Sequence, residues 1–232
     1  PGAPVKWCRE ILPLGRARGL VVNEGNANVF TGKVGYAAVR RTAKLAAKLL
    51  NVPENEVYIA STGVIGEPLN DSKIDGNPWE DSARAIMTTD TFPKGAWRQA
   101  DIDGERVTIG GIAKGSGMIA PNMATMLTFL FTDARLPVRV LNSLLRPAVA
   151  RSFNSITVDG DTSTSDSCLL FATGAGARHR AVTRAGDKRL DNFRGVLQEL
   201  MIDLAQQVVR DGEGASKFVT ISVRGASSEA AA

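Results

Sequence analysis

Apolar and polar positions along the 232-residue chain form helical stretches separated by short strand-like runs. Proline at position 137 suits the first turn of a helix, whereas Pro147 is expected to kink or end that helix. Apolar residues at helical spacing predict helices over 34–50, 79–87, from 137 onward and over 193–209. Runs rich in β-branched and aromatic residues predict strands over 20–23, 57–60, 106–112, 125–132, 155–158, 167–172 and 217–223.

The order of these elements favours one fold class. A turn at Asp103-Gly104 predicts a hairpin whose second strand is 106–112. Strands and helices mix without strict βαβ alternation, so an α+β layered arrangement is favoured over a doubly wound sheet. With 44% hydrophobic and 22% charged residues, the chain has the composition of an ordinary globular protein with one large core or two small ones.

Charge and hydropathy narrow the classes of function. The formal net charge is +4 and the pI is about 9.3, but Lys and Arg are scattered among Asp and Glu, which disfavours a nucleic-acid partner. The sequence contains neither a run of about 18 apolar residues nor the pattern of a signal peptide. No membrane association is therefore expected, and the default location is the cytoplasm, or the mitochondrion in a eukaryote.

Cysteine and histidine are scarce. Cys8 and Cys168 have no C-x-x-C neighbour and predict two reduced thiols rather than a disulfide or a metal site. His179, the one histidine, follows Arg178 in a Gly- and Arg-rich segment that predicts an exposed loop. A Ser-His-Asp triad is hard to build from this set. An N-terminal amine, with a reference pKa of about 7.7 to 8.0, is the substitute base for acyl chemistry.

The segment from Lys114 to Leu127 is the strongest candidate for chemistry. It is polar and rich in glycine at first, and it ends at Thr125, which opens an apolar strand. A hydroxyl at that point is held on a rigid element beside a flexible loop, as a nucleophile requires. The alternative is an unreactive threonine that begins a strand. Lys114 is either a solvated loop residue or a cation that holds a substrate carboxylate or lowers the pKa of a nearby amine.

Three other polar segments each allow two interpretations. Thr62 and Gly63 follow a strand in a loop where the backbone can approach a ligand closely, unless the loop is an ordinary tight turn. Glu213 lies between glycines at a helix end, where a negative charge gains nothing from the helix dipole; it indicates a binding role or a hydrophilic helix stop. The loop Asp159–Asp166 has side-chain oxygens that suit calcium, but it lacks the rest of an EF-hand, so no metal is expected.

Six segments of the chain occur in the order found in one family of enzymes. They are Gly-Asn-Ala-Asn (25–28), Ser-Thr-Gly-Val-Ile-Gly (61–66), Met-Thr-Thr-Asp (87–90), Asn-Met-Ala-Thr (122–125), Asp-Gly-Asp-Thr-Ser-Thr (159–164) and Asp-Gly-Glu-Gly (211–214). Together they resemble the self-cleaving ornithine acetyltransferases of arginine biosynthesis, also called glutamate N-acetyltransferases. The resemblance extends over nearly the whole chain.

The resemblance implies roles for particular residues. The bond between Ala124 and Thr125 is expected to be cut, so that Thr125 becomes an N-terminal nucleophile whose own amine acts as the base. The Thr62 hydroxyl and the Gly63 N–H are expected to form the oxyanion hole, with Lys114 at the active site. Further substrate contacts are implied for Thr88 or Thr89 and for Glu213, the last on the side of the ornithine.

The resemblance also implies the reaction and the architecture. Acetyl passes from N2-acetylornithine to Thr125 and then to glutamate in a ping-pong reaction without a cofactor, and acetyl-CoA is a possible second donor. The fold is an α/β sandwich with central sheets between helices, similar to N-terminal nucleophile hydrolases but with its own connectivity. Residues 1–124 and 125–232 become the α and β chains of one integrated domain, which assemble as α2β2 or larger. The family's first strands and C-terminal portion are expected to be absent from this sequence.

Two other functions stay open. A self-processing amidase or aminopeptidase of a related fold would pass the acyl group to water instead of glutamate. A non-catalytic module would use the glycine loops to bind a small molecule or an anion. Glutamate dependence separates the first alternative from acetyl transfer, and replacement of Thr125 by alanine separates the second.

Overall fold

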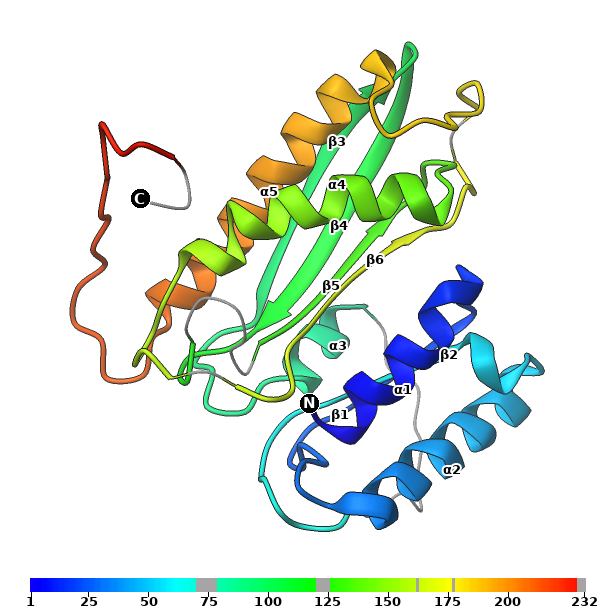
Figure 1. The fold of residues 1–232 in the computed structure, drawn as a ribbon, viewed down its shortest axis with the longest axis vertical. Helices are drawn as coiled ribbons and strands as arrows, with labels where there is room; N and C mark the ends of the chain where they lie inside the picture. Colours follow the sequence, from blue (N-terminus) through cyan, green and yellow to red (C-terminus); the bar gives the residue numbers. More distant parts are fainter. Residues whose placement is uncertain (70–78, 120–125, 162, 177, 229–232) are drawn as a thin grey trace.

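The computed structural model describes residues 1–69, 79–119, 126–161, 163–176 and 178–228 (Figure 1). Its larger sheet has the order β3-β4-β5-β6, in which β3, β4 and β5 are antiparallel neighbours and β5 and β6 are parallel. The smaller sheet consists of β1 and β2 in parallel. The strands are β1 Gly19–Asn23, β2 Val57–Ser61, β3 Lys94–Ile102, β4 Glu105–Lys114, β5 Leu127–Thr132 and β6 Ser167–Ala172. Five of the seven predicted strands are confirmed.

The hairpin between β3 and β4 has the predicted turn. Asp103 and Gly104 both have positive φ, at 60° and 80°, as the two central residues of a type I′ turn require. This turn matches the twist of the flanking strands, and it pairs Ile102 with Glu105. The register that follows along the hairpin places Lys94, at the start of β3, opposite Ala113 near the end of β4.

The helices and sheets form four layers (Figure 1). One face of the larger sheet packs against α4 and α5, and its core includes Leu130, Leu144 and Leu197. The opposite face packs against α3 and the smaller sheet through Phe129 and other residues. Helices α1 and α2 pack on the smaller sheet. The helices are α1 Ala3–Ile11, α2 Gly32–Leu50, α3 Trp79–Ala85, α4 Val138–Ala150 and α5 Asp191–Arg210. The predicted α/β sandwich with central sheets is confirmed.

Alternation of side chains along β5 explains why both faces of its sheet are covered. Leu130 belongs to the core under α4 and α5, whereas Phe129 belongs to the core on the other face. Because neighbouring residues of a strand point to opposite faces, a strand that is apolar at both positions needs a layer on each side. Burial of each such side chain contributes roughly 1.5–3 kcal/mol.

Four local predictions were wrong. Residues 155–158 contain no strand, because only Val158 pairs, through an isolated bridge to Ile119 with N···O distances of 2.6 and 2.7 Å. Residues 217–223 are extended and exposed, and no described strand pairs with them. The helix that contains Pro147 continues to Ala150, since the missing N–H falls in the last turn and removes only one helical bond.

The fourth error concerns His179, which was expected on an exposed loop. Its side chain is only 5% exposed. The N–H of Arg135 donates to its Nε2 at 3.0 Å, so the proton resides on Nδ1, which donates to the Arg180 carbonyl oxygen at 2.9 Å. Both ring nitrogens are satisfied by backbone groups, and the residue ties two loops together.

Other findings bear on the classes of function considered above. Cys8 and Cys168 are both free thiols, and burial raises the pKa of Cys8 to about 11. Among the helices in the described part of the chain, none combines the length and apolar content needed to cross a bilayer. Within the same residues, no three His, Cys, Asp or Glu side chains are grouped so that they could hold a metal ion.

Candidate functional site

Residues from four predicted motifs meet at one cavity of about 330 Å³. The cavity lies where β4 ends, beside the loop after α3, the turn after α5 and the loop that precedes β6. It is lined by Thr88, Thr89, Lys114, Ser116, Gly117, Met118, Asp159, Asp161 and Glu213. Four of these, Thr88, Thr89, Lys114 and Glu213, were predicted from the sequence. The others were missed as site residues because their types are common in loops.

Lys114 is the central side chain of the cavity. It is the last residue of β4 and only 2% exposed, so it is not the solvated loop residue that the sequence left open. Its Nζ donates to Oγ1 of Thr62 at 3.0 Å and to Oγ1 of Thr88 at 2.7 Å. The nearest carboxylate oxygen, Oδ2 of Asp90, is 3.9 Å away. Burial lowers the pKa of Lys114, and the more distant charge of Asp90 opposes that shift only in part.

Thr62 and Gly63 lie at the end of β2, where the chain leaves the smaller sheet. Thr62 is fully buried, and its N–H donates to the Asn23 carbonyl oxygen at 3.0 Å. Gly63 has φ of 123°, and a Cβ at this position would stand 2.3 Å from the carbonyl carbon of Gly25. Only glycine fits this close approach of two backbones. The structure therefore brings Thr62 to Lys114 although 52 positions separate them in sequence.

Thr88 and Thr89 have different partners. The Thr88 hydroxyl accepts from Lys114, whereas the Thr89 hydroxyl lies 2.6 Å from the Ser116 hydroxyl. Both line the cavity. The sequence could not distinguish the two threonines. In the structure Thr88 contacts the buried lysine, whereas Thr89 contacts Ser116, two residues further along the chain than that lysine.

Glu213 reaches the cavity from the turn after α5. Its N–H donates to the Ser116 carbonyl oxygen at 2.6 Å. A Cβ added to Gly117 would lie 3.2 Å from a carboxylate oxygen of Glu213 and 3.2 Å from one of Asp159, so glycine leaves room between the two carboxylates. Asp159 also accepts from the Met118 N–H at 3.1 Å. The cavity thus holds one buried ammonium group and several carboxylates, which suits a small molecule that carries both charges.

Ala124 and Thr125, the predicted cleavage site and nucleophile, lie outside the described residues. Leu127, two positions after Thr125 in the sequence, is paired with Lys114 across β4 and β5.

Asp166 holds the residue that follows Thr125. Its Oδ1 accepts from the Met126 N–H at 2.7 Å, and the Met126 carbonyl oxygen accepts from the Ser167 N–H at 3.1 Å. Burial raises the pKa of Asp166 to about 8. Nothing in the sequence distinguishes this aspartate from the rest of the loop Asp159–Asp166.

A second buried lysine lies beside the cavity without lining it. Lys94 is fully buried, and its Nζ donates to Oδ1 of Asp90 at 2.6 Å and to Oδ2 of Asp211 at 2.5 Å. Burial by itself would raise the pKa of Asp90, but the bond to Lys94 and the backbone N–H of Gly115 outweigh it and leave that pKa lowered. Burial would also raise the pKa of Asp211, but the hydrogen bonds from Lys94 and Thr91 outweigh it, so that pKa is lowered as well.

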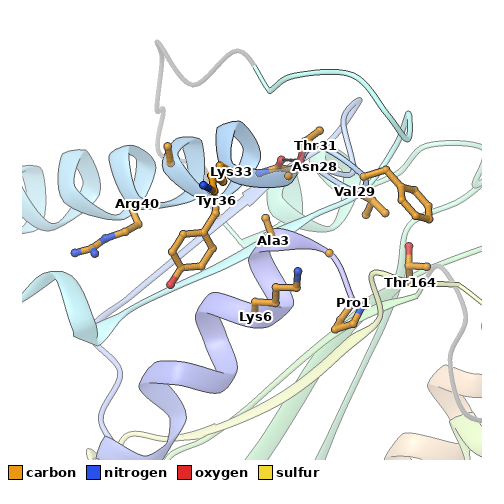
Figure 2. A pocket seen from close by; sticks show the side chains of 14 residues that line it. Pro1, Ala3, Lys6, Asn28, Val29, Thr31, Lys33, Tyr36, Arg40 and Thr164 are labelled. Carbon is orange, nitrogen blue, oxygen red and sulfur yellow. Dashed lines mark hydrogen bonds between the residues drawn. The ribbon is translucent and has the colours of Figure 1, made fainter.

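A larger cavity of about 940 Å³ lies elsewhere, between α1 and the start of α2 (Figure 2). Lys6, Tyr36 and Arg40 are among its lining residues, and Arg40 is already paired with Glu54 at 3.2 Å. None of the predicted chemical residues that the structure describes lines it. Size alone therefore does not identify the site; the convergence of polar motifs does.

Fold and cavity together describe an α/β sandwich with a polar cavity beside a buried lysine. The model of the ArgJ family matches residues 1–232. The chain is 55% identical to the arginine biosynthesis bifunctional protein ArgJ of Rhizobium meliloti (strain 1021) and 54% identical to that of Agrobacterium fabrum (strain C58 / ATCC 33970). Each alignment covers 100% of this chain and 59% of the relative. The chain belongs to the ArgJ family, and it spans about three fifths of the length of these curated relatives.

One solved structure supports the fold as well as the family. It is the arginine biosynthesis bifunctional protein ArgJ from Bacillus halodurans, which is 37% identical, with a TM-score of 0.50. The superposition covers 53% of this chain and 71% of that one. The family membership predicted from the six ordered segments is confirmed, while the role of each site residue stays a prediction.

Proposed function

We propose that this chain forms part of an acetyltransferase that moves acetyl from N2-acetylornithine to glutamate through an acetyl ester on Thr125. The supporting observation is that Lys114 contacts Thr62 and Thr88 at a cavity that Glu213 also lines. These residues come from motifs that are far apart in the sequence. The alternative interpretations, in which Thr62-Gly63 is an ordinary turn, Glu213 a helix stop and Lys114 a solvated residue, do not require them to lie together. Family membership adds independent support.

Maturation is proposed as the first step. The Thr125 hydroxyl attacks the Ala124 carbonyl carbon, and the peptide nitrogen leaves with a proton, which converts the amide into an ester. Water then hydrolyses the ester, which releases a carboxylate on Ala124 and restores the hydroxyl of Thr125 beside its free amine. Residues 1–124 and 125–232 become separate chains that stay in one domain, since β4 and β5 pair across the cut. The assembly of such paired α and β chains into a larger oligomer is part of this proposal.

Acetyl transfer follows the same chemistry in two halves. The Thr125 amine takes the hydroxyl proton while the oxygen attacks the acetyl carbon of N2-acetylornithine. Ornithine leaves as the amine after it receives that proton. The amine of glutamate then attacks the acetyl ester, Thr125 regains its proton, and N-acetylglutamate departs. The two substrates and Thr125 supply every atom and proton that is transferred in these two halves.

The contact between Lys114 and Thr62 explains how an oxyanion is stabilised. An ammonium group is only a donor, so the Thr62 oxygen is the acceptor at 3.0 Å and its own hydrogen is left to donate elsewhere. Aimed at the acetyl oxygen, and joined by the Gly63 N–H, this hydroxyl stabilises the tetrahedral intermediate. Each such donor is worth about 3 to 4 kcal/mol. The positive charge of Lys114 strengthens the Thr62 hydroxyl as a donor.

The carboxylates of the cavity select the donor substrate. Glu213, with Asp159 beside it, offers negative charge where the side-chain ammonium of ornithine would bind. Thr88, like Thr62, accepts from Lys114 and keeps its own hydrogen for the substrate. Glu213 is therefore assigned to ornithine, and Thr88 and Thr89 to further substrate contacts in the proposed site.

One experiment tests the proposal against its main rival. The full-length protein is incubated with N2-acetylornithine in the presence and absence of glutamate, and N-acetylglutamate, ornithine and acetate are quantified. Acetyl transfer predicts N-acetylglutamate with glutamate present and little acetate. Release of acetate at a rate that does not depend on glutamate would instead indicate an amidase. The Thr125→Ala protein serves as the control and should show neither product.

A further inference from the structure

We propose that Lys94 is a positioning residue for the acetyl donor: it joins the loop that carries Thr88 to the turn that carries Glu213, and so sets the width of the cavity. The inference rests on the proposed function for its kinetic consequences. Lys94 does not itself line the cavity. It acts through two aspartates, Asp90 and Asp211, one on each side.

Asp90 connects Lys94 to the loop that carries Thr88. Its Oδ1 accepts from Lys94 and from the Gly115 N–H, the latter at 2.7 Å. Its Oδ2 accepts from the Thr88 N–H at 3.2 Å. The residue before Gly115 is Lys114, so one carboxylate fixes the backbone on both sides of the contact between Lys114 and Thr88.

Asp211 connects Lys94 to the turn that carries Glu213. Its Oδ2 accepts from Lys94 and from the Thr91 N–H, the latter at 2.9 Å, and its Oδ1 accepts from the Thr91 hydroxyl. Glu213 lies two residues beyond Asp211, and its N–H donates to Ser116. The turn that presents the Glu213 carboxylate is therefore anchored to the same ammonium group as the loop of Thr88.

Stability alone is a weak reason for this arrangement. Buried ion networks are commonly matched or exceeded in stability by apolar side chains of similar volume. Three charged residues from two segments, Asp90 and Lys94 in one and Asp211 in the other, do, however, fix distances in a way that apolar contacts do not. Fixed distances matter here because the cavity must hold a substrate close to both Lys114 and Glu213, and a displacement of about 1 Å can cost about a hundredfold in rate.

The charge of Lys94 also bears on Lys114. The charged groups that act on Lys114 are Asp90, Lys94, Asp166 and Glu24. Asp90 and Asp166 favour its charged form, as does Glu24, whereas Lys94 opposes it. Removal of the Lys94 charge should therefore raise the pKa of Lys114 and move any limb of the pH profile that reports Lys114 toward higher pH.

Two variants of the full-length protein test the proposal. Lys94→Met removes the ammonium group that Asp90 and Asp211 share and is expected to weaken the fold. The double variant Lys94→Met/Asp211→Asn removes one positive and one negative charge, so the net charge of the network is that of the wild type. A matched control is Arg98→Met, which breaks a different ion pair between β3 and α5, Arg98 to Asp203 at 2.7 Å, away from the cavity.

The proposal predicts that stability and substrate binding separate in the double variant. Its melting temperature should recover toward that of the wild type, while its KM for N2-acetylornithine stays raised by about tenfold or more and its KM for glutamate changes less. A merely structural role predicts that both recover together, so a wild-type KM for N2-acetylornithine would overturn the proposal. Arg98→Met should leave both KM values unchanged.

Two further measurements keep the test decisive. If the double variant does not fold, Thr91→Val removes only the hydroxyl bond to Asp211 and should raise the same KM by a smaller factor; no change would overturn the proposal. If the wild type shows no acetyl transfer, the proposed function fails, and the crystal structure of the double variant decides the inference instead. Loss of the bond from the Glu213 N–H to Ser116 supports positioning by Lys94, and an unchanged turn refutes it.

Discussion

Lys94 and Lys114 are both buried, and they lie almost opposite each other at one end of the β3–β4 hairpin, yet their surroundings differ. Lys94 has a carboxylate oxygen within 2.6 Å on each of two sides. Lys114 has two hydroxyl oxygens at 2.7 and 3.0 Å, and its nearest carboxylate oxygen is 3.9 Å away. Burial therefore does not separate the roles proposed for the two lysines; the chemistry of the nearest partners does.

The difference has an energetic meaning. A buried ammonium group that is paired with carboxylates has most of its desolvation cost offset, whereas one that is held by hydroxyls does not. Lys114 accordingly has a lowered pKa, with burial as the main cause. A protein tolerates that cost where the cation performs a task, such as the polarisation of the hydroxyl of Thr62.

The largest effect expected from this comparison is on stability. Lys94→Met should lower the free energy of unfolding by about 3–5 kcal/mol, because Asp90 and Asp211 are left buried without their shared partner. Urea denaturation monitored by circular dichroism measures the change. Arg98→Met, at a half-exposed ion pair on the same strand, should cost no more than about 1 kcal/mol. Equal losses in the two variants would contradict the structural role of Lys94.

Lys114→Met should show the opposite pattern. Acetyl transfer should fall by about 10²- to 10³-fold, because Thr62 and Thr88 lose the donor that orients their hydroxyls. The free energy of unfolding should change by less than about 1 kcal/mol, since Asp90 stays paired with Lys94. Both quantities are measured on the same preparation of full-length protein. A large loss of stability with activity retained would reverse the roles assigned to the two lysines.

The Thr62 hydroxyl, which accepts from Lys114, sharpens the comparison further. Thr62→Val should lower kcat by about 10²-fold if this hydroxyl stabilises the oxyanion. Thr89→Val, which removes a cavity hydroxyl bonded to Ser116 instead, is the matched control and should lower kcat by much less. Steady-state kinetics with saturating glutamate separates kcat from KM. Equal effects on kcat would mean that the contact with Lys114 has no special role.

Asp166 offers a smaller effect, visible in the pH dependence of stability. Its ordinary pKa is 3.8, and burial raises it to about 8 in the folded protein. Between these values the folded state holds a proton that the unfolded state releases, so this group makes the free energy of unfolding fall as pH rises, by up to about 1.4 kcal/mol per pH unit.

Asp166→Asn should remove that part of the slope, because an amide does not titrate and still offers an oxygen to the Met126 N–H. Urea denaturation at several pH values between about 4 and about 8 checks the result. Asp203→Asn, at a partly exposed pair on α5, should leave the slope in this window nearly unchanged. An unaltered slope in Asp166→Asn would show that the buried carboxyl is not protonated in the folded protein.

Much of the fold could be predicted because local patterns coincide with tertiary demands. The hairpin turn at Asp103-Gly104 needs positive φ at both positions, and the sequence supplies residues that tolerate it. Residues 217–223 have the same alternation as a strand but no described partner, and alternation cannot tell whether a partner strand exists. His179 lies in a loop as predicted, but its polar neighbours did not indicate that the side chain is buried with backbone groups satisfying its ring.

Site residues could be predicted only where they lie in short segments that resemble a known family. Thr62, Thr88, Lys114 and Glu213 lie in segments that resemble a known family, and the structure brings them to one region. Lys94 lies outside these segments. Asp90 and Asp211 belong to two of them, but they are 121 positions apart in the sequence, and nothing in either segment indicates that the two aspartates share one lysine.

The central claim is that the cavity beside Lys114 serves acetyl transfer through Thr125, and peptide mapping by mass spectrometry tests it directly. The full-length protein is incubated with N2-acetylornithine without glutamate, quenched in acid and digested. The account predicts a peptide that begins at Thr125 and carries one acetyl group, which disappears when glutamate is added before the quench. A Thr125 peptide that is still joined to Ala124, or that never carries acetyl in active protein, would contradict the account.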